Sequence, residues 1–109
     1  MHMEIKFFNQ DIEKFIKNLN SATQAKVLRM LDLLEKFGNN LGMPYSKALS
    51  QGLFELRTGG KEKVRVMYVF HNNAVILLHA FIKKQSKISK QDMEIALARK
   101  KQLHNITHM

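Results

Sequence analysis

Three short apolar segments joined by two tight turns are the feature that most constrains how this chain can fold. The segments span residues 53–58, 63–70 and 74–82. Gly59-Gly60 separates the first two, and glycine supplies the positive φ that a hairpin turn needs. Asn72-Asn73 separates the last two, because asparagine tolerates the left-handed conformation. We therefore predict a three-stranded antiparallel meander.

The last of these segments, 74–82, is nearly all apolar, which is typical of a central strand covered on both faces. Its alternation leaves two alternatives open. In one, the even-numbered residues 76–82 face the packed helices and the odd-numbered residues 79–83 lie on the opposite face. In the other, the two sets exchange places.

Two helices are predicted ahead of the meander, after a strand over residues 3–8. The first helix spans about 10–19 and begins after the N-cap residue Asn9. Ser21 caps the second, which ends at Gly38. Because the link between the helices is short, we expect an antiparallel helical hairpin.

The remaining segments are a loop and a final helix. Residues 39–50 contain the only proline and two polar clusters, which predicts a loop. Ser89 caps the last helix, whose apolar candidates are Ile95, Leu97 and Leu103.

The predicted order is β-α-α-β-β-β-α, an α+β fold whose sheet is mainly antiparallel. The helical hairpin packs on one face, and the other face is open unless the last helix covers it. At 109 residues the chain is expected to form a single domain, 1–109, with its core at about 3–103.

Positive charge is concentrated in one half of the chain. The sequence has 18 lysines and arginines against 9 acidic residues, a formal net charge of +9. Residues 1–45 carry six basic and five acidic side chains, whereas residues 46–109 carry twelve and four. This imbalance favours a polyanionic partner; the alternative is a solvated basic surface.

Several classes of site are excluded or disfavoured. There is no cysteine, so disulfides, thiolate zinc sites and a thiol nucleophile are excluded. No apolar run is long enough to span a bilayer, and the charged amino terminus is unlike a signal peptide. We expect a cytoplasmic protein without a membrane partner. His104 and His108 have helical metal-ligand spacing but no third ligand, so neither a metal nor another cofactor is expected.

Arg57 and Arg65 flank the Gly59-Gly60 turn and can converge on one side of the sheet. Each guanidinium offers a planar fork suited to phosphate, and we expect both at a surface site. In the alternative, Arg57 forms a surface ion pair with Glu55 or Glu62.

His79, Phe81 and Lys83 lie on the same face as these arginines in the first of the two strand alternatives. An aromatic ring beside cations is what unpaired bases and phosphates need. In the other alternative Phe81 belongs to the core, and His79 can equally be a hydrogen-bonded structural residue.

Four segments together resemble a known family: Pro44–Leu49, Gly52–Arg57, Val64–Tyr68 and Leu77–Lys84. Over roughly residues 3–103 the chain is similar to the RelE/ParE superfamily of toxins, and most similar to its HigB-like, phage-derived branch. The fold of that superfamily agrees with the predicted order of elements.

The resemblance implies the toxin of a type II toxin–antitoxin pair that cleaves messenger RNA on the ribosome. In that reaction a ribose 2′-OH attacks the adjacent phosphate, and no metal is needed. The implied partners are the ribosome, messenger RNA and an antitoxin protein of the helix-turn-helix type. Two alternatives remain: a ParE-like toxin that inhibits DNA gyrase, and a phage-derived nucleic-acid-binding module without toxicity.

The resemblance also implies roles for individual residues. The expected catalytic residues are Arg57, Arg65, Lys83 and Lys84. RNA contact is implied by the resemblance for Lys47 and is expected from the local pattern of charged and aromatic residues for Lys61, Lys63, His79, Phe81 and Lys87. The general base is open among His79, Lys83 and Lys84, and we favour the lysines, with His79 as a packing or orienting residue.

Overall fold

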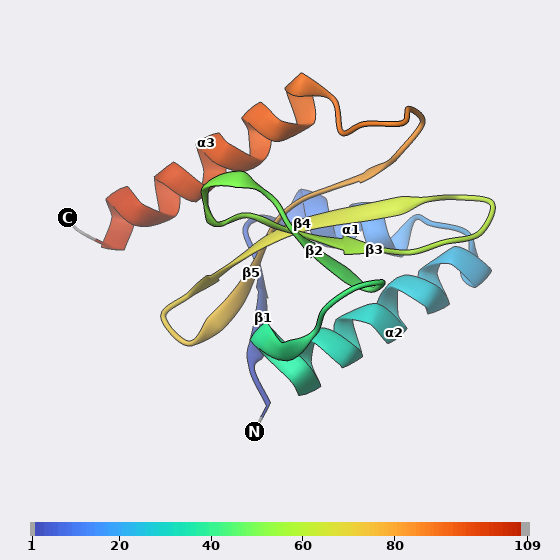
Figure 1. The fold of residues 1–109 in the computed structure, drawn as a ribbon, viewed down its shortest axis with the longest axis horizontal. Helices are drawn as coiled ribbons and strands as arrows, with labels where there is room; N and C mark the ends of the chain where they lie inside the picture. The colour runs from blue at the N-terminus through green and yellow to red at the C-terminus, as the bar shows by residue number, and fades with distance from the viewer. Residues whose placement is uncertain (1, 108–109) are drawn as a thin grey trace.

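A computed structural model describes residues 2–107 and confirms an α+β fold built on one five-stranded mixed sheet (Figure 1). The strands are β1 (Glu4–Phe7), β2 (Ser46–Ala48), β3 (Phe54–Arg57), β4 (Val64–His71) and β5 (Ala74–Ile82). The helices are α1 (Gln10–Lys17), α2 (Ser21–Phe37) and α3 (Lys90–Thr107), with short 3₁₀ turns at Gly38–Asn40 and Ser50–Gly52.

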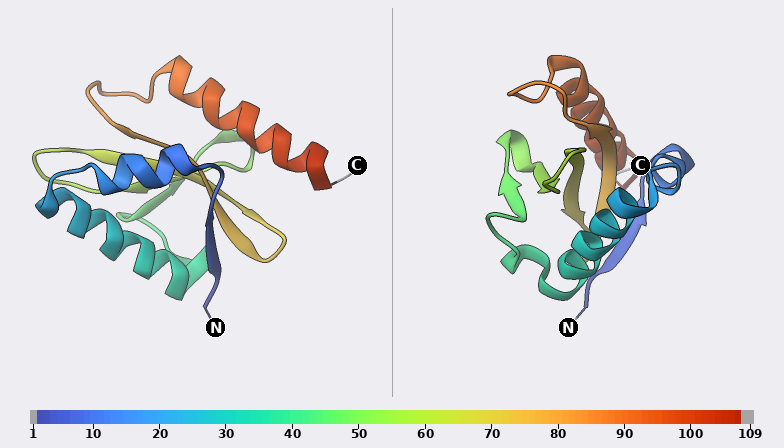
Figure 2. Two further views of the ribbon diagram at one scale, coloured as in Figure 1. Left: turned by 180° about the vertical axis from the view of Figure 1, so that it is seen from behind. Right: turned by 90° about the vertical axis from the view of Figure 1, so that its right-hand side faces the viewer.

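The strand order across the sheet is β1-β5-β4-β3-β2. β3, β4 and β5 form the predicted antiparallel meander, and β1 runs parallel to β5 at one edge. The Asn72-Asn73 turn has the predicted left-handed backbone, with φ of 50° and 61°. α1 and α2 pack on one face of the sheet, while α3 lies across its other side (Figures 1 and 2).

The prediction of a plain loop over 39–50 is wrong in part. Ser46–Ala48 forms β2, which pairs antiparallel with β3 and closes the far edge of the sheet. A segment of three residues is too short to show a period of two, so the sequence does not predict this strand. It is recognised only by its pairing with β3.

The helix boundaries follow the predicted side-chain caps with one exception. Asn9 accepts a hydrogen bond from the backbone N–H of Ile12, and Ser89 accepts one from that of Asp92. Asn20, and not Ser21, caps α2, because its side chain accepts from the N–H of Thr23 at 2.9 Å. The first helix therefore ends earlier than predicted, at Lys17, since the chain must turn before Asn20.

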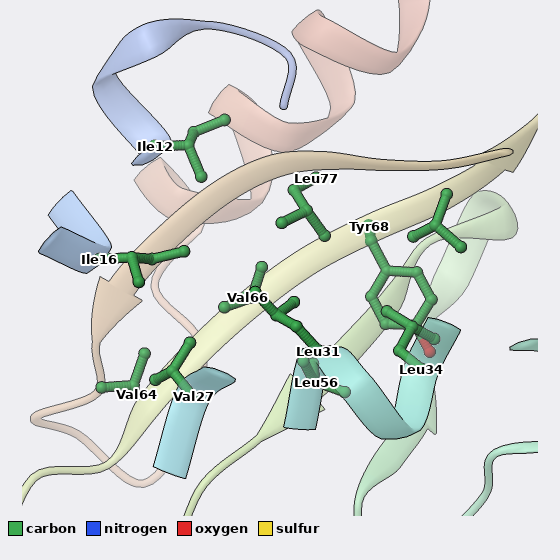
Figure 3. Close-up of a cluster of buried hydrophobic side chains, with 11 residues drawn as sticks. Ile12, Ile16, Val27, Leu31, Leu34, Leu56, Val64, Val66, Tyr68 and Leu77 are labelled. Carbon is green, nitrogen blue, oxygen red and sulfur yellow. The ribbon is translucent and has the colours of Figure 1, made fainter. Parts of the chain in front are cut away.

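The main core lies between the helical hairpin and the sheet (Figure 3). Its buried members are Ile12, Ile16, Val27, Leu31, Leu34, Leu56, Val64, Val66, Tyr68, Val75 and Leu77. A smaller core lies under α3, with Leu53, Met67, Val69, Ala74, Ile76, Leu78 and Ala96 as its buried members. Each large aliphatic side chain in these clusters contributes about 1.5–3 kcal/mol by leaving water.

A register shift in β5 resolves the two alternatives for its faces, because each holds for part of the strand. Met67 pairs with His79 but Tyr68 pairs with Leu77, which leaves Leu78 as an extra residue in the ladder. Before the shift the even-numbered residues face α3, and Ile76 and Leu78 lie in the smaller core. After it Ala80 and Ile82 pack against the main core, whereas Phe81 packs against the smaller one.

α3 covers the second face with a different set of residues from the one predicted. Leu97 and Leu103 pack on the smaller core as expected, joined by Met93 and the fully buried Ala96. Ile95 belongs to neither core, because a rotation of 100° per residue takes it off the stripe formed by 93, 96, 97 and 103.

Tyr68 on β4 makes a buried hydrogen bond with the hydroxyl of Ser46 on β2, and it stacks on Phe54. We expect Tyr68→Phe to lower the free energy of unfolding by about 1–2 kcal/mol, because it leaves the Ser46 hydroxyl buried and unpaired. Urea unfolding at neutral pH measures this loss.

The same residue gives a pH dependence. Burial raises the pKa of Tyr68 above its ordinary value of 10.0, so the native state holds this proton more tightly than the unfolded state does. Stability from this group is therefore complete below pH 10 and is lost as the pH rises through the native pKa. Between pH 9 and 11 the wild type should lose more stability than Tyr68→Phe; equal losses would contradict the assignment.

Candidate functional site

Arg57, Arg65 and Phe81 form one row across three adjacent strands. Arg57 on β3 lies opposite Arg65 on β4, which lies opposite Phe81 on β5. Because Val64 and Val66 belong to the main core, Arg65 between them belongs to the α3 side of the sheet. The two arginines that flank the turn are therefore neighbours, as their positions in the sequence predict.

Glu55 is a buried carboxylate between the two guanidinium groups. Its Oε1 is 3.3 Å from Nε of Arg57 and 3.8 Å from Nε of Arg65. Glu62 does not take part, because it accepts hydrogen bonds from Asn20 and Thr23. The expected alternative for Arg57, an ion pair with Glu55, is thus present, although the carboxylate is buried and does not lie on the surface.

Arg65 is not the surface residue that the sequence predicts, since only 5% of it is exposed. Its Nη1 donates to the backbone oxygens of Thr58 at 2.8 Å and Val64 at 3.0 Å, which braces the turn between β3 and β4. Burial lowers the pKa of Arg65, and Arg57 lowers it further, while Glu55 opposes the shift. Arg57 is more accessible, with 29% of its side chain exposed.

A cavity of about 400 Å³, here called the arginine cleft, opens beside these residues at the end of β3. It is lined by Lys26, Arg29, Met30, Pro44, Tyr45, Arg57, Thr58, Gly59 and Arg65. Four of these side chains are cations and none is a carboxylate. α2, the segment before β2 and the end of β3 all contribute, so the cleft attracts anions from several sides.

A second cavity of about 260 Å³, here called the lysine cleft, lies between the end of β5 and the start of α3. It is lined by Phe81, Ile82, Lys83, Lys84, Gln85, Lys87, Ser89, Gln91 and Asp92. The backbone N–H of Lys83 donates to the backbone oxygen of Lys63 at 2.7 Å. This hydrogen bond fixes the end of β5 against the start of β4. Three lysines with one carboxylate leave this cleft net positive.

His79 connects β5 to the first turn of α3. Its Nε2 is 2.7 Å from Oδ1 of Asp92, and Oδ2 of Asp92 accepts from the hydroxyl of Ser89 at 2.7 Å. The ring of His79 stacks on Phe81 with centroids 5.4 Å apart, and 15% of the side chain is exposed. This arrangement orients the imidazole and attaches the helix to the sheet.

Of the four remaining predicted RNA-binding residues, one lines a cleft and three line neither. Lys87 lines the lysine cleft, while Lys61 and Lys63 are exposed in the segment between β3 and β4. Lys47 is exposed on β2 and lies opposite Glu55, one row away from the arginines. The structure thus places Arg57 and Arg65 at the arginine cleft. It places Phe81 at the lysine cleft, together with Lys83, Lys84 and Lys87.

Two cations and the aromatic ring of the arginine cleft are absent from the site residues predicted from the sequence: Lys26, Arg29 and Tyr45. The i, i+3 spacing of Lys26 and Arg29 places them on one face of a helix, which is the only signal that the sequence carries. No sequence pattern within α2 predicts that the face with Lys26 and Arg29 lies against the turn before β4. In the structure a side chain at Gly60 would collide with Nζ of Lys26, so α2 and the turn are in close contact.

Among residues 2–107 no group of three histidines or carboxylates is placed to hold a metal ion. His104 lies on α3, whereas His108 is outside the described residues. In the same range no helix is both long and apolar enough to cross a membrane.

A family model described as "Phage derived protein Gp49-like (DUF891)" matches residues 14–101. The matched range runs from α1 into α3 and includes every residue that lines the two clefts. No curated protein matches the sequence.

Arg57 and Arg65 should differ in their effect on stability. We expect Arg65→Met to lower the free energy of unfolding by at least about 2 kcal/mol, since the change removes a buried donor from the backbone oxygens of Thr58 and Val64. Arg57→Met should cost less than about 1 kcal/mol, because the residue is partly solvated. Urea unfolding of both variants measures this difference, and equal losses would contradict a structural role for Arg65.

Proposed function

The chain belongs to the Gp49-like family of phage-derived proteins, which is associated with toxins of the RelE/HigB type, and on that premise we propose that it is the toxin of a type II toxin–antitoxin pair. We further propose that it cleaves messenger RNA on the ribosome. The partners in this proposal are the ribosome, messenger RNA and a cognate antitoxin protein.

The observation that carries the proposal is the row formed by Arg57, Arg65 and Phe81, with a cationic cleft at each end. RNA cleavage by its own 2′-OH needs cations on the phosphate and a surface that holds unstacked bases. The guanidinium groups of Arg57 and Arg65 supply the cations, and the ring of Phe81 beside the lysines supplies the surface for a base.

In the proposed reaction the 2′ oxygen forms a bond to the adjacent phosphorus, and the bond from phosphorus to the 5′ oxygen breaks. A base takes the proton of the 2′-OH, and an acid returns one to the departing 5′ oxygen. The products are a 2′,3′-cyclic phosphate and a 5′-OH end. Negative charge grows on the phosphate during attack, so fixed cations accelerate this step.

Arg57 is the residue proposed to touch the phosphate, because it is the more accessible of the two arginines and lines the arginine cleft. Arg65 adds a buried positive charge one strand away and shares Glu55 with Arg57. Lys83 and Lys84 at the lysine cleft supply counter-charge or act as acid and base.

His79 is assigned an orienting role. Its Nε2 is held by Asp92, and one face of its ring stacks on Phe81. His79 therefore supports Phe81, which lines the lysine cleft. The lysines, in contrast, line a cleft directly.

Expression of the chain in a bacterial host tests the function as a whole. We expect protein synthesis to stop and primer extension to map new cuts within translated reading frames. Arg57→Ala should lose both effects, whereas Lys14→Ala, an exposed change on α1, should retain them. Continued translation with a collapse of DNA supercoiling would instead support gyrase inhibition, and the absence of any toxicity would support a binding module.

Single-turnover cleavage on programmed ribosomes tests the assignment of the base. We expect Lys83→Ala or Lys84→Ala to lose 10²-fold or more, about the lower limit for removal of a proton-transfer group, while His79→Gln stays near wild type. A loss of that size confined to His79→Gln, in a protein whose unfolding curve is unchanged, would contradict the assignment.

A further inference from the structure

The arginine cleft has features of a binding site that the proposed reaction does not use. Its volume of about 400 Å³ falls within the range of small-molecule pockets. α2 contributes Lys26 and Arg29, neither of which has a role in the proposed chemistry. Within residues 2–107 neither side chain forms an ion pair with a carboxylate, so their charge is available to a ligand.

The two arginines of the cleft are also incompletely satisfied. Nη1 of Arg57 is directed at the sulfur of Met43 at 3.8 Å, and a thioether is a weak acceptor. Nε of Arg65 is buried without a hydrogen-bond partner in the described part of the chain. An anion in the cleft would give the accessible Arg57 a stronger acceptor than this sulfur, while the buried Arg65 adds positive charge behind it.

Tyr45 provides an exposed aromatic surface beside these cations, with 43% of the residue accessible. Hydrogen bonds hold the backbone of Tyr45 in place. Its N–H donates to the backbone oxygen of Gly42, and its carbonyl oxygen accepts from the backbone N–H of Arg57 at 2.8 Å. The ring and the Arg57 guanidinium are therefore held on adjacent segments. An aromatic ring next to cations is the arrangement that binds one unstacked base and its phosphate.

We propose that the arginine cleft is a nucleotide subsite for single-stranded RNA, in which Tyr45 stacks on a base and Lys26, Arg29 and Arg57 contact its phosphate. The proposal rests on the proposed function, since it takes RNA as the substrate. Stacking accepts every base, so this subsite adds affinity and position along the strand with little sequence preference. Because the cleft lies at the Arg57 end of the row formed by Arg57, Arg65 and Phe81, we assign it to a nucleotide that flanks the cleaved bond.

The test measures binding separately from cleavage. The probe is a fluorescent single-stranded RNA of about six nucleotides that carries 2′-O-methyl groups and so lacks the nucleophile. We expect Tyr45→Ala to weaken binding about tenfold and Tyr45→Phe to stay within about twofold of wild type, because the phenyl ring still stacks. The double variant Lys26→Ala/Arg29→Ala should also bind about tenfold more weakly and show a shallower salt dependence.

The matched control is Lys14→Ala/Lys17→Ala, which removes the same charge from α1, outside both clefts. Unchanged binding by Tyr45→Ala, an equal loss in the control, or no binding by the wild type would overturn the subsite. A preference for an acidic peptide over RNA, with the same dependence on Tyr45, would identify the cleft as a protein-binding site instead.

Ribosomal cleavage by the wild type separates the two proposals. Tyr45-dependent binding of the probe without any cleavage leaves the subsite in place and rejects the nuclease. Cleavage together with Tyr45-independent binding rejects the subsite and leaves the nuclease in place.

Discussion

The buried carboxylate of Glu55 is the interaction on which the basic end of the sheet depends. Arg57 and Arg65 lie opposite each other on neighbouring strands, and their like charges repel. One oxygen of Glu55 lies near both, which offsets the repulsion and part of the cost of burying Arg65. The cluster stays net positive, so it can be compact in the free protein and still attract an anion.

The extra residue in β5 has a comparable effect on the other cleft. Without the shift at Leu78, one face of β5 would continue unbroken, and His79 and Phe81 would lie with Leu77 toward the main core. With it, His79 reaches Asp92 on α3 and Phe81 reaches the wall of the lysine cleft. A single irregularity thus lets one strand contribute both to the hydrophobic core and to a polar site.

Much of the fold could be predicted because its signals are local. The meander follows from two turns and three apolar runs, and the strand Ala74–Ile82 has the predicted bounds. The three residues of β2 show no periodicity, so the sequence does not predict this strand, and adjacent Asn20 and Ser21 have the same capping chemistry, so it does not fix which of them caps α2. For the cap, the two candidates are one residue apart, which local preferences do not resolve.

The sequence by itself determined the order of the helices and of every strand except β2, the excess of positive charge after residue 45 and the match to a family associated with RelE/HigB-type toxins, since composition, periodicity and short motifs are properties of the chain alone. Only the tertiary structure decided that Arg65 is buried while Arg57 is accessible, and that Lys26, Arg29 and Tyr45 share a cleft with them. These residues come from segments up to 39 positions apart, from Lys26 to Arg65. Their proximity depends on how α2 packs on the sheet, and periodicity within a segment specifies which face is buried but not which distant residues that face will meet.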